Sequence, residues 1–301
     1  MKTWRSGSVL TVAVAQAVAA CGGGGGTGSS APPVSQPPPT TTPPGSAKTF
    51  IVSGAISGFG SVIVNGERYD TSTTTVRIEE RIGTVSELRV GEVVRMEAEE
   101  DGRGGRRART IDMRRLLQGA VESVDASRGT MTVAGQRVII DDDTSFDDSF
   151  AERSIGSIGV GERVEVHGFL GSDGQARATR LDRASAGDGE IEVKGMLGSL
   201  DAAARRFVIG DLRVDYSAAS LERFGAEGPR EGDLVEVKGR EYLADGTLRA
   251  TRVEREGDRF DGGDSTEVEV QGLITRFGSS EDFDVAGKKV RTNAGTSFVH
   301  G

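Results

Sequence analysis

Carboxylate side chains are concentrated in one short stretch of the sequence. The stretch contains Asp141, Asp142, Asp143, Asp147 and Asp148. Hard cations such as Ca²⁺ are bound by several carboxylate and carbonyl oxygens of one loop, so these five residues are the candidate metal ligands. Their spacing lacks the alternate acidic positions and the central glycine of an EF-hand loop. A solvated turn is therefore the favoured interpretation, and calcium binding is the alternative.

Basic side chains gather at one place as well. Arg103, Arg106 and Arg107 lie in a glycine-containing stretch that the sequence pattern places in a loop between two strands. These residues are the candidate ligand-binding residues, for a phosphate-bearing glycan or an acidic partner. The competing interpretation is a flexible turn whose charge is balanced by the nearby Glu97, Glu99 and Glu100.

The single cysteine, Cys21, follows an N-terminal segment with three distinct parts. A positive start with Lys2 and Arg5 is followed by a short apolar run and by small residues that lead to Val18-Ala-Ala-Cys21. This order is typical of a secretory signal, and the apolar run is too short to cross a membrane. The segment resembles the bacterial lipoprotein signal. The resemblance implies lipidation of Cys21 and, because Gly22 follows it, an outer-membrane location in a Gram-negative cell.

The stretch after Cys21 predicts a tether. It is rich in glycine and serine and then in proline, a composition that cannot bury a core and favours an extended, disordered chain. We expect residues 21–48 to hold the rest of the protein away from the membrane to which Cys21 is attached.

A recurring sequence motif, the refrain, is found in the remainder of the chain. The segment Ile158-Gly-Val-Gly-Glu-Arg-Val-Glu-Val-His-Gly168 recurs in similar form at 88–98 and 229–239. It reads as a tight turn at Gly91, Gly161 or Gly232 followed by a strand with alternating inward valines. Three copies of one turn and strand predict three copies of one module.

Each module shows the same further pattern of short strands. An opening strand contains Gly54, Gly119, Gly195 or Gly272, and a two-residue hairpin turn follows at 65–66, 134–135, 210–211 or 286–287. Such turns favour residues that tolerate positive φ, as in Asn65-Gly66. A polar stretch with a single apolar anchor then precedes the refrain, and we expect it to form a short helix or an irregular crossing. The anchors are Val76, Phe146, Leu221 and Phe298.

The pattern predicts an all-β protein made of tandem, small, five-stranded OB-like barrels after the disordered tether. A small open sandwich is the alternative. The repeated glycine and valine motifs resemble the bacterial domain-of-unknown-function family 5666, and this resemblance brings no activity with it. We expect a signal peptide at 1–20, a linker at 21–48, repeats at 49–115, 116–186 and 187–257, and an incomplete fourth repeat at 264–301.

The fourth repeat ends before its refrain. This favours a fragment of a longer protein, and the alternative is a partner chain or neighbouring module that completes the sheet. An exposed, half-built sheet would present unpaired strand edges.

The repeats also allow a test of candidate catalytic residues. A site that is present in every repeat must use residues at equivalent positions of all the repeats. His167 corresponds to Glu97 and Lys238, on the outward face of the refrain strand, which predicts a solvated surface residue. With two histidines and one cysteine in the chain, thiol catalysis and histidine-based metal sites are disfavoured, and we do not expect an enzyme.

The net charge of −9 disfavours nucleic acid as a partner, since phosphate binding depends on lysine and arginine. We therefore predict a non-catalytic, lipid-anchored cell-envelope protein that binds an envelope glycan, peptide or protein and has no cofactor. A structural spacer is the main alternative, and calcium-dependent adhesion is a weaker one.

Overall fold

The computed structural model describes residues 10–14, 48–100, 104–171, 173–184, 189–256, 267–272, 274–285 and 288–298. The tether up to residue 47 and most of the predicted signal peptide lie outside these ranges. Within them the chain is all-β, and its helical elements are two 3₁₀ helices, η1 (Val85–Glu87) and η2 (Ile155–Ser157). None of the described helices is long and apolar enough to span a bilayer.

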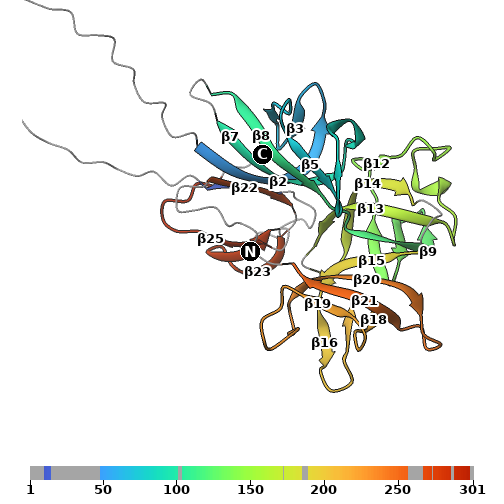
Figure 1. Cartoon of the computed structure of the whole chain (residues 1–301). Coiled ribbons are helices and arrows are strands. Elements are labelled where there is room, and N and C mark those ends of the chain that lie inside the picture. The colour runs from blue at the N-terminus through green and yellow to red at the C-terminus, as the bar shows by residue number, and fades with distance from the viewer. Residues whose placement is uncertain are drawn as a thin grey trace, which may run out of the picture.

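The strands group into four consecutive sets (Figure 1). The first set is β2 (Lys48–Gly58), β3 (Val62–Val64), β4 (Glu67–Tyr69), β5 (Thr75–Ile78), β6 (Arg81–Gly83), β7 (Val93–Glu100) and β8 (Arg106–Met113). The second is β9 (Leu117–Asp125), β10 (Thr130–Val133), β11 (Gln136–Ile139), β12 (Ser145–Phe146), β13 (Arg163–Leu170) and β14 (Ala176–Arg183). The third is β15 (Ile191–Met196), β16 (Gly198–Asp201), β17 (Arg206–Ile209), β18 (Leu212–Asp215), β19 (Ser220–Glu222), β20 (Leu234–Tyr242) and β21 (Leu248–Arg255). The fourth is β22 (Glu267–Gly272), β23 (Ile274–Ser279), β24 (Asp282–Val285) and β25 (Lys288–Arg291), and β1 (Leu10–Val14) precedes them all.

In the second repeat, the order in which the strands pair begins and ends with the same strand, β9. β9 pairs antiparallel with β10, and β10 with β11. β11 then runs parallel to β14, while β14 and β9 are both antiparallel to β13. The third repeat shares the parallel step, between β18 and β21, and in the first repeat a bridge between Asp70 and Arg107 replaces it. The tandem repeats thus share one order of strands.

The predicted turns are confirmed where the structure describes them. Asn65 has φ of 53° and Ala134 has φ of 48°, the left-handed values that a tight hairpin requires. The refrain glycines Gly91, Gly161 and Gly232 have φ of 90°, 87° and 79°. A side chain at these positions would strain the backbone, which explains why glycine recurs there. The fourth hairpin turn, at 286–287, lies outside the described residues.

The refrain residues that alternation predicts to point inward are buried. Val94, Val164 and Val235 are at most 1% exposed. The aligned apolar residues of the crossing differ in burial, because Val76 and Phe146 are buried whereas Leu221 and Phe298 are exposed. Val76 and Phe146 lie in β5 and β12, short strands that pair parallel with the last strand of their repeats. The sequence had predicted a short helix or an irregular crossing here, and the 3₁₀ helices η1 and η2 follow these strands.

The second and third repeats pack as a pseudo-symmetric pair. Leu117 of β9 and Val193 of β15 occupy the same position in their repeats and face each other in an antiparallel pairing, which joins the two repeats into one thirteen-stranded sheet. Their hairpin turns meet as well, where the Gln136 amide donates to the Ile209 carbonyl at 2.7 Å. One apolar core runs through both repeats.

The first repeat docks onto this pair through its refrain turn. The Thr179 hydroxyl of β14 donates to the Gly91 carbonyl at 2.5 Å, and the Arg180 guanidinium donates to the Val90 carbonyl at 3.3 Å. At the equivalent turns of Gly161 and Gly232, no described residue beyond the chain neighbours has an atom within 4 Å of the place where a Cβ would stand. Among the described residues, the same local structure therefore serves as a docking element in the first repeat.

Strands of the fourth repeat lie against the first. β22 runs parallel to β2 and antiparallel to β1, a strand that falls inside the segment predicted to be a signal peptide. β23, β24 and β25 form a separate three-stranded sheet with a small core around Phe283. Figure 1 shows this repeat beside the first and facing the second and third.

Candidate ligand site at the junction of the repeats

Charged residues on the outward faces of β15 and β20 form the centre of the junction. Because alternate side chains of a strand point to opposite faces, the valines enter the core while Glu192, Lys194, Glu236 and Lys238 point away from it. The register places Glu192 opposite Lys238 and Lys194 opposite Glu236. Opposite charges therefore face each other at both cross-strand pairs, an arrangement that stabilises a sheet.

Neighbouring repeats cover this charged face. The Glu192 side chain is 0% exposed and that of Glu236 is 2% exposed. The Lys194 ammonium is 3.0 Å from a Glu236 carboxylate oxygen, and the Lys238 ammonium is 3.5 Å from Glu192. The contact between Lys194 and Glu236 is a buried ion pair, and the loss of such a pair costs far more than the loss of a surface pair.

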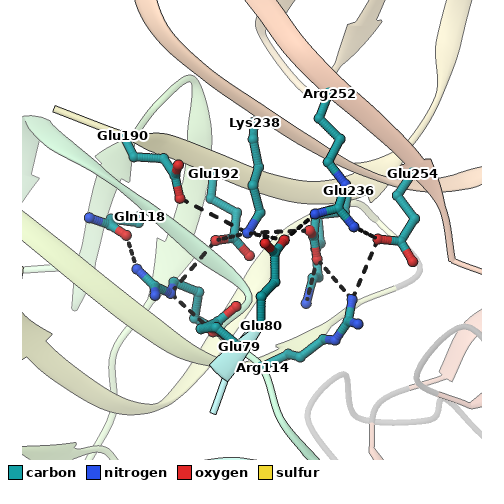
Figure 2. A network of polar contacts seen from close by, with 12 residues as sticks. Glu79, Glu80, Arg114, Gln118, Glu190, Glu192, Glu236, Lys238, Arg252 and Glu254 are labelled. Atoms are coloured by element: carbon teal, nitrogen blue, oxygen red, sulfur yellow. Dashed lines mark hydrogen bonds and ion pairs between the residues drawn. The ribbon is translucent and has the colours of Figure 1, made fainter. Parts of the chain in front are cut away.

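Two other segments complete the cluster (Figure 2). The tip of the β5–β6 hairpin brings Glu79 to Arg115, at 3.1 Å, and Glu80 to Lys238, at 3.3 Å. Arg114 lies between β8 and β9 and contacts Glu236 at 3.6 Å. The first repeat is thus connected by charge to the second and third. We name this set of residues the charged junction: Glu79, Glu80, Arg114, Arg115, Glu192, Lys194, Glu236 and Lys238.

The two buried glutamates of the charged junction titrate in opposite directions. Burial raises the pKa of Glu192 to about 8, and the negative charge of Glu79 adds to this effect. Burial opposes the ionisation of Glu236 as well, but Lys194 and Lys238 outweigh it and lower the pKa of Glu236 to about 2. Glu236 is therefore the ionised partner of the lysines at neutral pH, and Glu192 holds its proton.

The prediction that His167 is a solvated residue was wrong. Its side chain is 2% exposed, because β13 contributes its outward face to the same region between repeats. Burial, with the positive charges of Arg115 and Arg180 nearby, lowers the pKa of His167 to about 3. The imidazole is therefore neutral in the folded protein.

This burial predicts a contribution of His167 to acid sensitivity. The unfolded chain takes up a proton near pH 6.5 and the folded chain only near pH 3, so stability falls as the pH drops through that interval. We expect His167→Gln to weaken the pH dependence of the unfolding midpoint between those values. Urea unfolding of both proteins at several pH values measures it, and identical slopes would contradict the assignment.

A cleft lies beside the charged junction. Its cavity volume is about 180 Å³, and all four repeats line it. The apolar side chains of its wall are Val93, Val94, Leu116, Phe169, Leu170 and Leu234. The basic ones are Arg95, Arg114, Arg115, Lys194 and Lys288, and the acidic ones are Asp112 and Glu256. A concave site with an apolar wall and a few convergent polar groups has the general make-up of a small-molecule site.

The basic residues identified in the sequence lie elsewhere. Arg103 is outside the described residues, and Arg106 and Arg107 belong to strand β8, not to a loop, because their pairing with Glu100 and Glu99 extends the strand. The Arg106 guanidinium donates to the Tyr69 hydroxyl at 3.1 Å and lies over that ring. Arg107 is 3.7 Å from Asp70. Both have partners within their own repeat, and a role in ligand binding stays a prediction.

The acidic stretch does not converge on one point. Asp141 pairs with Arg177, whereas Asp147 lies 3.6 Å from Arg180 and Asp148 lies 2.6 Å from Arg153. Asp142 and Asp143 are exposed. Across the described ranges, the structure holds no group of three or more acidic, histidine or cysteine side chains arranged to bind a metal ion.

The residues of the charged junction were not predicted from the sequence. Those in the refrain, Glu236 and Lys238, occupy outward positions, which alternation alone indicates to be solvated. One pattern in the sequence nevertheless indicates some of these residues. Charges of opposite sign occupy alternate positions of two strands, as Glu192 and Lys194, then Glu236 and Lys238. Such complementary alternation indicates cross-strand ion pairs, although it does not reveal that another repeat covers them.

Fold and site together define an all-β protein of tandem sheet repeats that close around a buried charged junction. A family model described as a domain of unknown function, DUF5666, matches residues 51–112, 118–182 and 190–254. These ranges coincide with the three complete repeats and span well over half of the chain. The chain therefore belongs to the DUF5666 family, as the resemblance of its motifs had predicted.

Solved structures with partial similarity include a Drosophila chain described as Unr CSD456, with 14% identity and a TM-score of 0.19 over 57% of this chain and 79% of the other. Another is a multidomain protein with nucleic acid binding domains from Streptococcus pneumoniae, with 13% identity and a TM-score of 0.17 over 67% and 72%. No curated protein matches the chain.

Proposed function

We propose that this chain is a non-catalytic binding protein of the cell envelope, built from OB-type modules and anchored through a lipid on Cys21. The strand order supports the OB-type assignment, because the third and fifth strands run parallel and the fourth pairs with the first. The ligand would be an envelope glycan, peptide or protein, and the cleft between the repeats would receive part of it.

The observation that carries this proposal is the cleft. A junction whose only role is to fix the repeats would be expected to pack to the density of a protein interior, with few voids larger than a water molecule. Here a cavity of about 180 Å³ remains, and its wall combines apolar side chains with charged ones. The compact arrangement also favours binding over a spacer, since repeats packed around one centre add little length.

Lipid anchorage is tested by Cys21→Ala. We expect the wild-type chain to incorporate labelled palmitate and to sediment with the outer membrane of a Gram-negative host. The variant should do neither, because stable anchorage requires the acyl chains. A variant that still sediments with membranes, beside a wild type that takes up no label, would show the anchor to be wrong.

Binding itself is tested by co-sedimentation of the purified full chain with isolated envelope glycan and, separately, with envelope proteins. We expect saturable binding to one fraction and no effect of nucleic acid as competitor. Arg107→Gln serves as a parallel variant, and a loss of binding there would move the site from the cleft to the basic residues of β8. Absence of saturable binding to every fraction would favour the spacer.

A further inference from the structure

We propose that β22 is the acceptor edge for one extended strand of a partner polypeptide. The partner strand has apolar residues at alternate positions and a basic residue opposite Glu269, and it joins the sheet antiparallel to β22. The inference rests on the proposed lipid anchor, because cleavage before Cys21 removes β1, and it goes beyond the binding of a ligand in the cleft.

β1 is the terminal strand of the sheet that joins the first and fourth repeats. The order of this sheet begins with β1, β22 and β2, so β22 has one neighbour on each side. All five residues of β1 pair antiparallel with residues 268–272. When β1 is removed, the strand pairings of the described residues leave that side of β22 unpaired. An unpaired edge is a template for the addition of another strand.

On β22, β1 occupies the place that the refrain strand occupies in the complete repeats. There the refrain strand is antiparallel to the opening strand, and the glycine of the opening strand lies opposite an inward valine of the refrain. These pairs are Gly54 with Val94, Gly119 with Val164, and Gly195 with Val235. In the fourth repeat, Gly272 lies opposite Leu10 of β1. The register of a refrain strand therefore describes the strand that fits this edge.

The apolar positions of the partner follow from this register. Val270 is 5% exposed and belongs to the small core around Phe283. Residues directly opposite each other in an antiparallel pair lie on the same face of the sheet. The partner therefore needs an apolar residue opposite Val270 and others two positions before and after it. β1 has Leu10, Val12 and Val14 at these register positions.

The charge of the partner follows from the position between two apolar ones. Glu269 lies opposite Ala13 of β1, which supplies no charge. The equivalent residue of the third repeat is Glu192, and it lies opposite Lys238. Residues of opposite charge at directly opposed positions stabilise a sheet. A partner with lysine or arginine in place of Ala13 therefore fits the edge better than β1 does.

A second copy of this chain fits the edge less well. Its refrain strands β7, β13 and β20 are each paired on both sides within their own sheets. Its own β22 contains Glu267 and Glu269 and no basic residue, so the pairing of two such strands would bring four acidic residues together. Repulsion between like charges opposes that pairing. The edge therefore favours a different polypeptide with a basic residue.

Peptide binding to the cleaved protein, extracted in detergent from the membranes of a Gram-negative host, tests the acceptor edge. The fluorescently labelled peptides comprise residues 8–16 with Ala13→Lys or with Ala13→Glu, and fluorescence anisotropy measures their affinity. The lysine peptide should bind saturably, and the glutamate peptide should bind about threefold to tenfold more weakly. Methylation of the backbone nitrogens of Thr11 and Val12 should abolish binding, because one of two successive N–H groups must face β22.

Two comparisons locate the binding at β22. The 301-residue chain produced without export retains β1 and should bind the lysine peptide at least about tenfold more weakly, since its own strand competes for the edge. In the cleaved protein, Glu269→Lys should reverse the preference and favour the glutamate peptide. Glu281→Lys makes the same change of charge between β23 and β24 and should keep the wild-type preference. Circular dichroism and unfolding midpoints show whether both variants remain folded.

The outcomes separate this inference from the proposed function. If neither peptide binds saturably to the cleaved protein, or if Glu269→Lys keeps the wild-type preference, the acceptor edge is overturned while the lipid anchor stands. Dimerisation of the cleaved protein that the lysine peptide disrupts would make a second copy the occupant and overturn the separate partner. Mass spectrometry of the extracted protein is the last readout, because retention of residues 1–20 would overturn both the anchor and the open edge.

Discussion

Gly91→Ala should lower the free energy of unfolding by about 2–5 kcal/mol, whereas Gly161→Ala should lower it by about 1–2 kcal/mol. Both glycines occupy the same turn of the refrain with nearly the same positive φ, so a side chain strains the backbone equally at either position. Only at Gly91 would the added Cβ also meet a neighbour, 2.5 Å from the Thr179 carbonyl oxygen.

The obstacle at Gly91 cannot move cheaply, because it is backbone. The Thr179 carbonyl belongs to β14, which pairs with β13 on both sides of a bulge at Thr179. Relief therefore requires the first repeat to move away from the second, which would break the hydrogen bond from the Thr179 hydroxyl to the Gly91 carbonyl. We expect the variant to fold within each repeat but to lose contact between these two.

Differential scanning calorimetry of the full chain distinguishes the two effects. Gly161→Ala should lower the midpoint temperature of unfolding modestly and keep the shape of the transition. Gly91→Ala should instead separate the unfolding of the first repeat from that of the pair formed by the second and third. Gly232→Ala is a second control, since that turn is also open around its glycine. Equal losses in all three variants would mean that the docking of Gly91 contributes nothing.

What the sequence could predict is the structure within a repeat. Turns such as Asn65-Gly66 and the alternation of Val164 and Val166 with outward residues depend on neighbours a few residues away, so a short pattern contains the necessary information. The strand order follows from the same pattern repeated. Leu221 shows the limit, because it aligns with the buried Phe146 but is 43% exposed in its own repeat.

What the sequence could not predict is which copy of an equivalent position is covered by another repeat. Glu97, His167 and Lys238 occupy one position of the refrain strand, yet their side chains are 47%, 2% and 11% exposed. The differences arise from packing between repeats, and an alignment of the repeats averages them away. Comparison of copies therefore identified the scaffold but concealed the charged junction, which uses positions that differ from repeat to repeat.

Glu236→Gln and Glu192→Gln should have opposite effects, although both replace a buried glutamate of the charged junction by its neutral isostere. At neutral pH Glu236→Gln removes the carboxylate that lies 3.0 Å from Lys194 and 3.7 Å from Lys238, and loss of one member of a buried ion pair costs about 3–5 kcal/mol. Glu192→Gln removes no charge at that pH, because burial raises the pKa of Glu192 to about 8. At that pH only the unfolded wild type is ionised at this position, so we expect Glu192→Gln to raise the free energy of unfolding near neutrality.

The pH dependence separates the two residues further. The folded pKa of Glu236 is about 2 and its ordinary value is 4.5, so its contribution is present above 4.5 and is lost as the pH falls towards 2. For Glu192 the folded pKa lies above the ordinary value of 4.5, so the folded chain retains a proton that the unfolded chain releases, and stability falls as the pH rises from 4.5 to 8. The stability of Glu192→Gln relative to the wild type should therefore increase as the pH rises through that range.

Urea unfolding of the wild type and both variants, from acid to mildly alkaline pH, measures these differences. Glu99→Gln is a control, because Glu99 lies on β7 outside the charged junction and pairs with Arg107 and Arg109 near the surface. If Glu192→Gln were as destabilising at neutral pH as Glu236→Gln, both glutamates would be ionised in the folded protein. The charged junction would then carry one more negative charge than it does with a protonated Glu192. No proton would then be held on Glu192 at the contact between the repeats.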